Sequence, residues 1–288
     1  MRTFVLILLL VSFPHMTFGA AEEPLEIAGA SAVIYKRVDQ TNLFLYIFNP
    51  KGHQKSDKRP TAVFFFGGGW NGGTPTQFEH HCRHLADKGM VAMVADYRVK
   101  SRQGTTPKEC VMDGKSAIRW IRSNADKLGV DPSRIAAGGG SAGGHVAAAT
   151  GTVVGMEQLG EDIRVSSRPN ALLLFNPVFD NSPAGYGHSR VKDVYPQISP
   201  MHNIKKTTPP TIVFLGTKDS LIPVATAKEY KKRMEKVDCR CDLHLYDGQS
   251  HGFFNYGNQK YYIDTVGKMD AFLASLDYIP PAKSGTCD

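Results

Sequence analysis

The sequence has no long hydrophobic run, no internal repeat and no low-complexity tract. A membrane-spanning helix needs roughly 18 consecutive apolar residues, and the longest apolar stretch of this chain, residues 4–13, is much shorter. Repeat proteins, disordered chains and integral membrane proteins are therefore poor matches. With 288 residues, 42% of them hydrophobic, the chain can instead fill one substantial core as a single domain.

The apolar stretch 4–13 has the features of a targeting segment. Arg2 precedes it, and the small residues Gly19, Ala20 and Ala21 follow it. A positive charge, then a short apolar run and then small residues are typical of a secretory signal peptide. We expect residues 1–20 to be removed, leaving a secreted or periplasmic domain over 21–288 with no membrane span in the mature protein.

Cysteine is scarce, and its count of five is odd. Such a set does not suggest a disulfide framework, and at least one thiol must stay free. Cys239 and Cys241 are too close on one strand to reach disulfide geometry. Cys82 and Cys110 are the pair to test first for a disulfide, since spacing alone leaves the connectivity open.

Acidic residues are outnumbered by basic ones, 27 to 34, so the formal net charge is +7. The only dense basic segment is 228–236, where glutamates alternate with lysines and arginine. This pattern is typical of a solvated helix face, not of a nucleic-acid-binding stripe. We expect no nucleic-acid partner, and the oligomeric state stays open.

One cluster of glycines surrounds a serine. The segment GGGSAGG, 138–144, follows the apolar run 134–137 and precedes a small-residue helix. In this setting GxSxG (Gly139, Ser141, Gly143) is a nucleophile elbow, in which side chains at the two glycines would collide with the crossing strand and helix. Ser141 is therefore the candidate nucleophile.

The same residues also spell GxGxxG, a dinucleotide-binding fingerprint, through Gly138, Gly140 and Gly143. That interpretation requires an acidic residue at the end of the next strand, about 20 residues further on. The next expected strand, 171–175, ends in Asn176. The nucleotide-binding hypothesis is therefore weaker than the nucleophile hypothesis. The hypothesis that the segment is only a tight turn is also weaker.

A second glycine cluster, 67–73, directly follows the apolar strand expected at 61–66. Attack by a serine on an ester creates an alkoxide, which fixed N–H donors must stabilise. We assign this oxyanion hole to the backbone N–H groups of Gly68, Gly69 and Ala142. A flexible glycine loop is the simpler alternative.

An acid and a histidine follow later strands, so the chain order is serine, aspartate, histidine. Asp219 ends the strand expected at 211–219, and His251 follows the one at 241–248. Asp247 is the alternative acid. A long irregular passage, 176–210, suggests an insertion that lines the substrate pocket, whose aromatic wall we expect from Trp70, Phe179, Tyr186 and Tyr195.

One cluster invites a metal hypothesis. His80, His81, Cys82 and His84 lie on the helix expected at 76–88, with His80 and His84 one turn apart. No further ligand at a familiar spacing completes a site. We expect solvated histidines there, and we expect neither a metal nor a cofactor.

Strand and helix patterns alternate along the chain, which predicts an α/β fold. The remaining expected strands are 26–36, 41–48 and 90–98, and the remaining helices are 106–128, the segment after Ser141, 228–236 and 261–276. Residues 131–134 are expected to form a turn into the elbow strand.

Together these motifs resemble the α/β-hydrolase superfamily, and within it the secreted acetyl esterase/lipase group related to hormone-sensitive lipases. FFFGGGW is similar to that group's HGGGW loop, GGGSAGG to its GDSAGG elbow, GTKDSLIP to its acid-bearing strand end and SHGF to its histidine loop. The resemblance implies a central, mostly parallel eight-stranded sheet flanked by helices, without a large cap domain. Phe66 and Gly140 depart from the pattern, so the hydrogen bonds that the usual histidine and aspartate give to the oxyanion loop must come from elsewhere.

The expected function is that of a serine carboxylesterase acting on short, acetyl-type acyl esters, of small molecules or on saccharides. Two alternatives remain. DSLIP, 219–223, also resembles prolyl-oligopeptidase catalytic domains, although this chain has no room for their gating propeller. The second alternative is a binding protein on a hydrolase scaffold. Such a protein would lack the serine, the aspartate or the histidine.

Overall fold

Short apolar segments of the chain form the strands of one sheet. The computed structural model describes residues 23–281, so the expected signal peptide at 1–20 and Cys287 lie outside the described part. The strands are β1 Ser31–Val38, β2 Thr41–Phe48, β3 Arg59–Phe65, β4 Val91–Ala95, β5 Val130–Gly140, β6 Ala171–Phe175, β7 Thr211–Gly216 and β8 Cys241–Tyr246.

The strands are ordered β1-β2-β4-β3-β5-β6-β7-β8 in a single eight-stranded sheet. β2 is antiparallel to both β1 and β4, whereas the pairs from β4 through β8 are parallel. The residues of β4, β6 and β7 are all buried, as expected for parallel strands covered on both faces. The predicted mostly parallel sheet is therefore confirmed.

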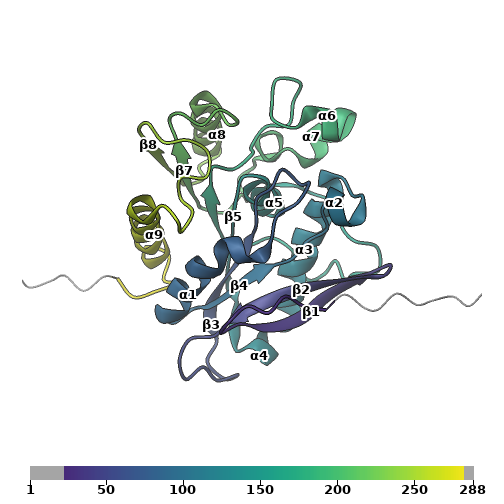
Figure 1. Cartoon of the computed structure of the whole chain (residues 1–288), viewed down its shortest axis with the longest axis vertical. Helices are drawn as coiled ribbons and strands as arrows, with labels where there is room; N and C mark the ends of the chain where they lie inside the picture. Colours follow the sequence, from purple (N-terminus) through teal and green to yellow (C-terminus); the bar gives the residue numbers. More distant parts are fainter. Residues whose placement is uncertain (1–22, 282–288) are drawn as a thin grey trace, which may run out of the picture.

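Helices cover both faces of this sheet (Figure 1). The helices α3, α5 and α8 pack on one face, and α1 and α9 pack on the other. α5 is buried along its whole length. Within residues 23–281 no helix is both long and apolar enough to span a bilayer. The helices are α1 Glu79–Asp87, α2 Lys100–Gln103, α3 Pro107–Ser123, α4 Ala125–Leu128, α5 Ala142–Thr152, α6 His188–Val191, α7 Tyr195–Ile198, α8 Val224–Lys236 and α9 Gln259–Ala274.

Several boundaries differ from the expected ones. β1 begins at Ser31, not at residue 26, because residues 28 and 29 form a turn before the chain pairs with β2. The helix expected at 106–128 is interrupted at Asn124. Residues 131–134 form a bulge within β5, where the register against β3 jumps from Val130 to Ile135. The passage 176–210 contains only short helices and 3-10 turns after β6.

The suggested disulfide between Cys82 and Cys110 is wrong. Both thiols are free and fully buried. Cys82 on α1 packs in the cluster beneath one face of the sheet, and Cys110 on α3 packs in the cluster on the opposite face. The sheet lies between them, so no bond can form.

The sequence-based expectation of solvated histidines on α1 is also wrong for His81. This residue has no exposed surface, and its ring lies against those of Phe78 and Phe175 at 4.9 and 5.2 Å between centroids. Burial lowers the pKa of His81 to about 3. It is therefore a neutral core residue.

Replacing Gly143 with alanine should disrupt folding. A methyl group there would lie 2.0 Å from the carbonyl oxygen of Phe65 and 2.3 Å from that of Phe66. We expect a loss of about 3 kcal/mol or more in the free energy of unfolding, measured by urea denaturation. Gly267, on α9, is the control, because a methyl group there meets nothing within 4 Å and should stabilise by up to about 1 kcal/mol. Equal stability of Gly143→Ala and the unchanged protein would contradict this account.

Candidate active site

Ser141 sits at a strained bend between β5 and α5. Its φ of 54° and ψ of −118° are unusual for a residue with a side chain, and such strain persists only where surrounding contacts enforce it. Its N–H donates to the carbonyl of Phe175 at 3.0 Å, and its carbonyl accepts from His145 at 3.0 Å. These bonds hold the backbone so that the hydroxyl stands clear of the sheet edge.

The two glycines that flank Ser141 are required by space. A Cβ at Gly139 would lie 2.5 Å from the carbonyl oxygen of Gly143, and one at Gly143 would meet the carbonyl of Phe65 even more closely. Strand β5 and helix α5 therefore approach each other at this turn as closely as backbone permits.

The imidazole of His251 joins the serine to an aspartate. Its Nε2 lies 2.8 Å from Ser141 Oγ, and its Nδ1 lies 2.7 Å from Asp219 Oδ2. Asp219 follows β7, and its other carboxylate oxygen accepts from the backbone N–H groups of Leu221 and Ile222 at 2.9 and 3.0 Å. All three predicted residues are thus brought together at the carboxyl edge of the sheet.

The environment of Asp219 keeps it ionised. Burial alone would raise its pKa, but the hydrogen bond from His251 and those from the Ile222 and Leu221 backbone N–H groups lower that pKa below its ordinary value. A carboxylate at Nδ1 places the ring proton there and leaves the lone pair of Nε2 facing Ser141. Asp247, the alternative acid, instead accepts from the Thr217 hydroxyl at 3.1 Å.

Two of the three predicted oxyanion donors belong to the glycine loop, and the third, Ala142, directly follows Ser141. A Cβ on Gly67 would come within 3.3 Å of Ser141 Cβ, so the glycine loop begins directly against this serine. Gly68 and Gly69 have φ values of 123° and 62°, which residues with side chains rarely adopt. Among the described residues, the N–H groups of Gly68, Gly69 and Ala142 have no acceptor, which leaves them available for an incoming oxygen.

A chain of side-chain amides, which the sequence motifs did not predict, connects the glycine loop to the histidine loop. Gly67 N–H donates to Gln77 Oε1 at 2.6 Å, and Gln77 Nε2 donates to Asn255 Oδ1 at 3.0 Å. Asn255 Nδ2 then donates to the carbonyl of Gly252 at 2.8 Å. These contacts provide the support for the oxyanion loop that Phe66 and Gly140 cannot give.

Asn176 completes this chain on the far side of the histidine. Its Oδ1 accepts from Gly252 N–H at 3.0 Å, and its Nδ2 lies 3.3 Å from His251 Nε2. The one signal in the sequence was its position, directly after β6 at the edge where Ser141 and Asp219 also lie. Gln77 and Asn255 carry no such signal, because their partners are distant in the chain.

Replacing Gln77 with leucine should slow turnover without unfolding the protein. The glycine loop would lose the acceptor of Gly67 N–H, and misplacement of an oxyanion donor by a fraction of an ångström is costly. We expect kcat for 4-nitrophenyl acetate to fall about 10- to 100-fold with KM changed much less. Gln249→Leu is the matched control, because Gln249 bonds to Tyr261 at 2.8 Å outside the chain of amides. Equal kinetics for the two variants would refute this role.

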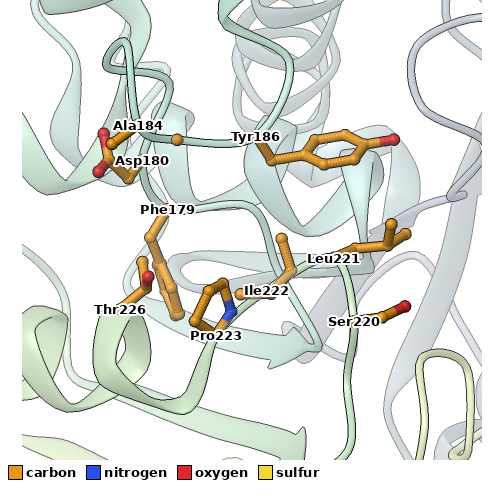
Figure 2. A pocket seen from close by; sticks show the side chains of 10 residues that line it. Phe179, Asp180, Ala184, Tyr186, Ser220, Leu221, Ile222, Pro223 and Thr226 are labelled. Atoms are coloured by element: carbon orange, nitrogen blue, oxygen red, sulfur yellow. The ribbon is translucent and has the colours of Figure 1, made fainter.

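A pocket of about 270 Å³ lies between the passage after β6 and the segment that follows Asp219. Figure 2 shows Phe179, Ile222 and Pro223 on one side of it, with Tyr186 and Ala184 on the loop above. Of the four predicted aromatics, Phe179 and Tyr186 therefore line this pocket. Trp70 is buried against His145 and Tyr186, and Tyr195 packs against the rings of His188 and His202.

The histidines of α1 are engaged in other contacts. His84 Nε2 lies 2.9 Å from both carboxylate oxygens of Asp270, and the His80 ring stacks on Tyr256. Within residues 23–281, no group of three or more His, Cys, Asp or Glu side chains is placed to hold a metal ion.

Comparison with known proteins shows the family of this chain. The family model BD-FAE matches residues 45–184, and that of the dienelactone hydrolase family matches residues 176–279. Esterase 2 of Thermogutta terrifontis, solved after phosphoramylation by tabun, is 44% identical, with a TM-score of 0.87 over 91% of this chain and 100% of that one. The chain belongs to the α/β-hydrolase superfamily, among its esterases.

A further structure of the Thermogutta protein and a curated relative are also esterases by name. The same Thermogutta esterase has been solved with propionate bound, at 43% identity and a TM-score of 0.86 over 90% of this chain and 98% of that one. Esterase LipC of Mycobacterium tuberculosis is 29% identical over 216 residues, which are 67% of this chain and 53% of LipC. The chain thus spans about half the length of LipC.

Proposed function

We propose that this protein is a serine carboxylesterase that cleaves short-chain, acetyl-type acyl esters through an acyl-enzyme intermediate. The observation that carries the proposal is a single imidazole, His251, hydrogen-bonded to Ser141 through one nitrogen and to Asp219 through the other. This arrangement suits a nucleophile, a general base and a carboxylate that orients the base. A binding protein on the same scaffold would not need it.

In the first half-reaction, Ser141 Oγ attacks the ester carbonyl carbon while its proton moves to His251 Nε2. The carbonyl oxygen becomes an alkoxide, which the N–H groups of Gly68, Gly69 and Ala142 stabilise. The alkoxide then collapses, the bond to the leaving oxygen breaks, and that oxygen takes the proton from Nε2. Asp219 stabilises the imidazolium in between.

Water completes the cycle by the reverse route. It gives a proton to His251 Nε2 as it attacks the acyl carbon, and the bond to Ser141 Oγ breaks as that proton returns to the serine. The positive end of the α5 dipole, at Ala142, lies beside the developing charge.

A short acyl group is supported by the related Thermogutta esterase, which was solved with propionate and with butyrate bound. The His251 side chain is 22% exposed, which leaves the histidine accessible from solvent, and a saccharide is proposed as the alcohol. We also propose a secreted or periplasmic location, on the pattern of residues 1–20.

Two measurements test this function. Labelling with a fluorophosphonate followed by peptide mapping should modify Ser141, and 4-nitrophenyl esters should show the highest kcat/KM at two to four acyl carbons. Aminoacyl nitroanilides should be cleaved poorly. Amide cleavage without ester turnover would overturn the esterase in favour of a peptidase, and labelling at another serine would overturn the assigned nucleophile.

A further inference from the structure

A second pocket, of about 440 Å³, opens beside the glycine loop and has two basic residues, Lys100 and Arg190, in its wall. Segments far apart in the sequence line it: the loop at Gly69 and Trp70, the region of α2 from Lys100 to Thr106, and α6 through Arg190. Figure 1 shows α2 and α6 on the same side of the molecule. Among the side chains that the structure describes, no aspartate or glutamate lines this pocket.

Arg190 has no carboxylate partner among the side chains that the structure describes, and other contacts hold it in place. Its Nη1 donates to the carbonyl oxygen of Gly69, and its guanidinium lies 5.7 Å from the Trp70 ring and 5.6 Å from the Tyr186 ring. Ring contacts of this kind fix the guanidinium plane. An arginine has five N–H donors, and only Nη1 of Arg190 donates a hydrogen bond to the described side chains and backbone, in which the Asp193 side chain is not included.

Lys100 adds a second uncompensated charge at the same pocket. Its backbone N–H donates to the Trp70 carbonyl at 3.0 Å, and its side chain is exposed without an acidic partner in the described part of the chain. By contrast, Arg98, Arg102 and Arg233 each pair with a carboxylate.

We infer that this pocket binds a carboxylate carried by the ester substrate, recognised chiefly by Arg190 and supported by Lys100. The inference rests on the proposed esterase function and specifies its substrate class. A guanidinium binds a carboxylate through two parallel N–H donors, and the second cation raises the local anion concentration. Because Gly69 belongs to both the oxyanion loop and this pocket, the carboxylate lies near the reacting carbonyl, on either the acyl or the alcohol side.

Matched pairs of esters test the inference. On the acyl side, 4-nitrophenyl hydrogen glutarate is compared with its neutral methyl ester; on the alcohol side, 4-carboxyphenyl acetate is compared with 4-carbamoylphenyl acetate. In at least one pair, we expect the unchanged enzyme to favour the carboxylate about tenfold in kcat/KM, and the pair that responds identifies the side. Added salt should weaken the preference.

Variants locate the effect. Arg190→Gln should remove the preference, lowering kcat/KM for the carboxylate ester about 10- to 30-fold more than for its neutral partner. Arg190→Lys should retain part of it, and Lys100→Gln should reduce it about threefold. Lys51→Gln, which removes an exposed charge outside this pocket, should leave the ratio unchanged.

Two outcomes would overturn the inference while leaving the esterase intact. One is an absence of preference in both pairs; the other is an equal loss on charged and neutral esters in Arg190→Gln, which would mean that Arg190 acts only by bracing Gly69. If the unchanged protein hydrolyses neither neutral ester, the proposed function itself fails.

Discussion

Ser141→Ala should lower kcat for 4-nitrophenyl acetate by about 10⁵-fold or more, because the bond-forming oxygen is lost. The fold should survive, since the only side-chain hydrogen bond of Ser141 among the described residues is to His251 and alanine keeps the same Cβ at the strained φ. Steady-state kinetics measure the rate, and fluorophosphonate labelling should disappear in parallel. Circular dichroism and the melting temperature should stay close to those of the unchanged protein.

The control for this variant is Ser220→Ala, which removes a serine hydroxyl beside Asp219 and at the rim of the smaller pocket. Its turnover should stay within about threefold of the unchanged enzyme. A residual rate in Ser141→Ala within tenfold of the unchanged enzyme, with an intact fold, would show that another group forms the acyl intermediate.

Asp219→Asn should have the second-largest effect, about 10⁴-fold in kcat, because an amide at Nδ1 favours the wrong tautomer of His251. The substitution preserves size, and the oxygen of the new amide can still accept from the Leu221 and Ile222 N–H groups. We therefore expect a folded protein that still binds ester with a similar KM. The kinetics of a slow ester, followed with concentrated enzyme, measure the loss.

Asp247→Asn separates this account from its alternative. Asp247 contacts Thr217, not His251, so its replacement should change kcat by less than about threefold. A large loss in Asp247→Asn together with a small one in Asp219→Asn would reverse the assignment of the acid.

The central strands and the two glycine loops were predictable because each is defined by its own residues. Wholly apolar runs such as 61–65 and 171–175 are buried between two layers of helices, and paired glycines beside them mark places where backbone must approach backbone. The chain order of Ser141, Asp219 and His251 follows from the same rule, since parallel strands end at one edge of a sheet.

Other features depend on partners far away in the chain. β1 begins at Ser31, where it can pair with β2. The strand propensities of residues 26–36 do not reveal this starting point. His81 is buried because rings from Phe175 and Tyr262 surround it, although neighbouring His80 and His84 suggest exposure. Cys82 and Cys110 are separated by the sheet, a fact that spacing along the chain cannot express.

The amino-acid sequence by itself determined the sheet, the position of the sharp bend at Ser141 and the residues able to carry an acyl transfer, because strand burial and backbone crowding are local demands on residue type. Only the tertiary structure decided what supports and surrounds these groups. The amides of Gln77, Asn255 and Asn176 and the basic wall at Arg190 and Lys100 arise from loops that meet at one edge of the sheet. Hydrogen bonds and charges act through space, so their partners appear only when the chain is folded.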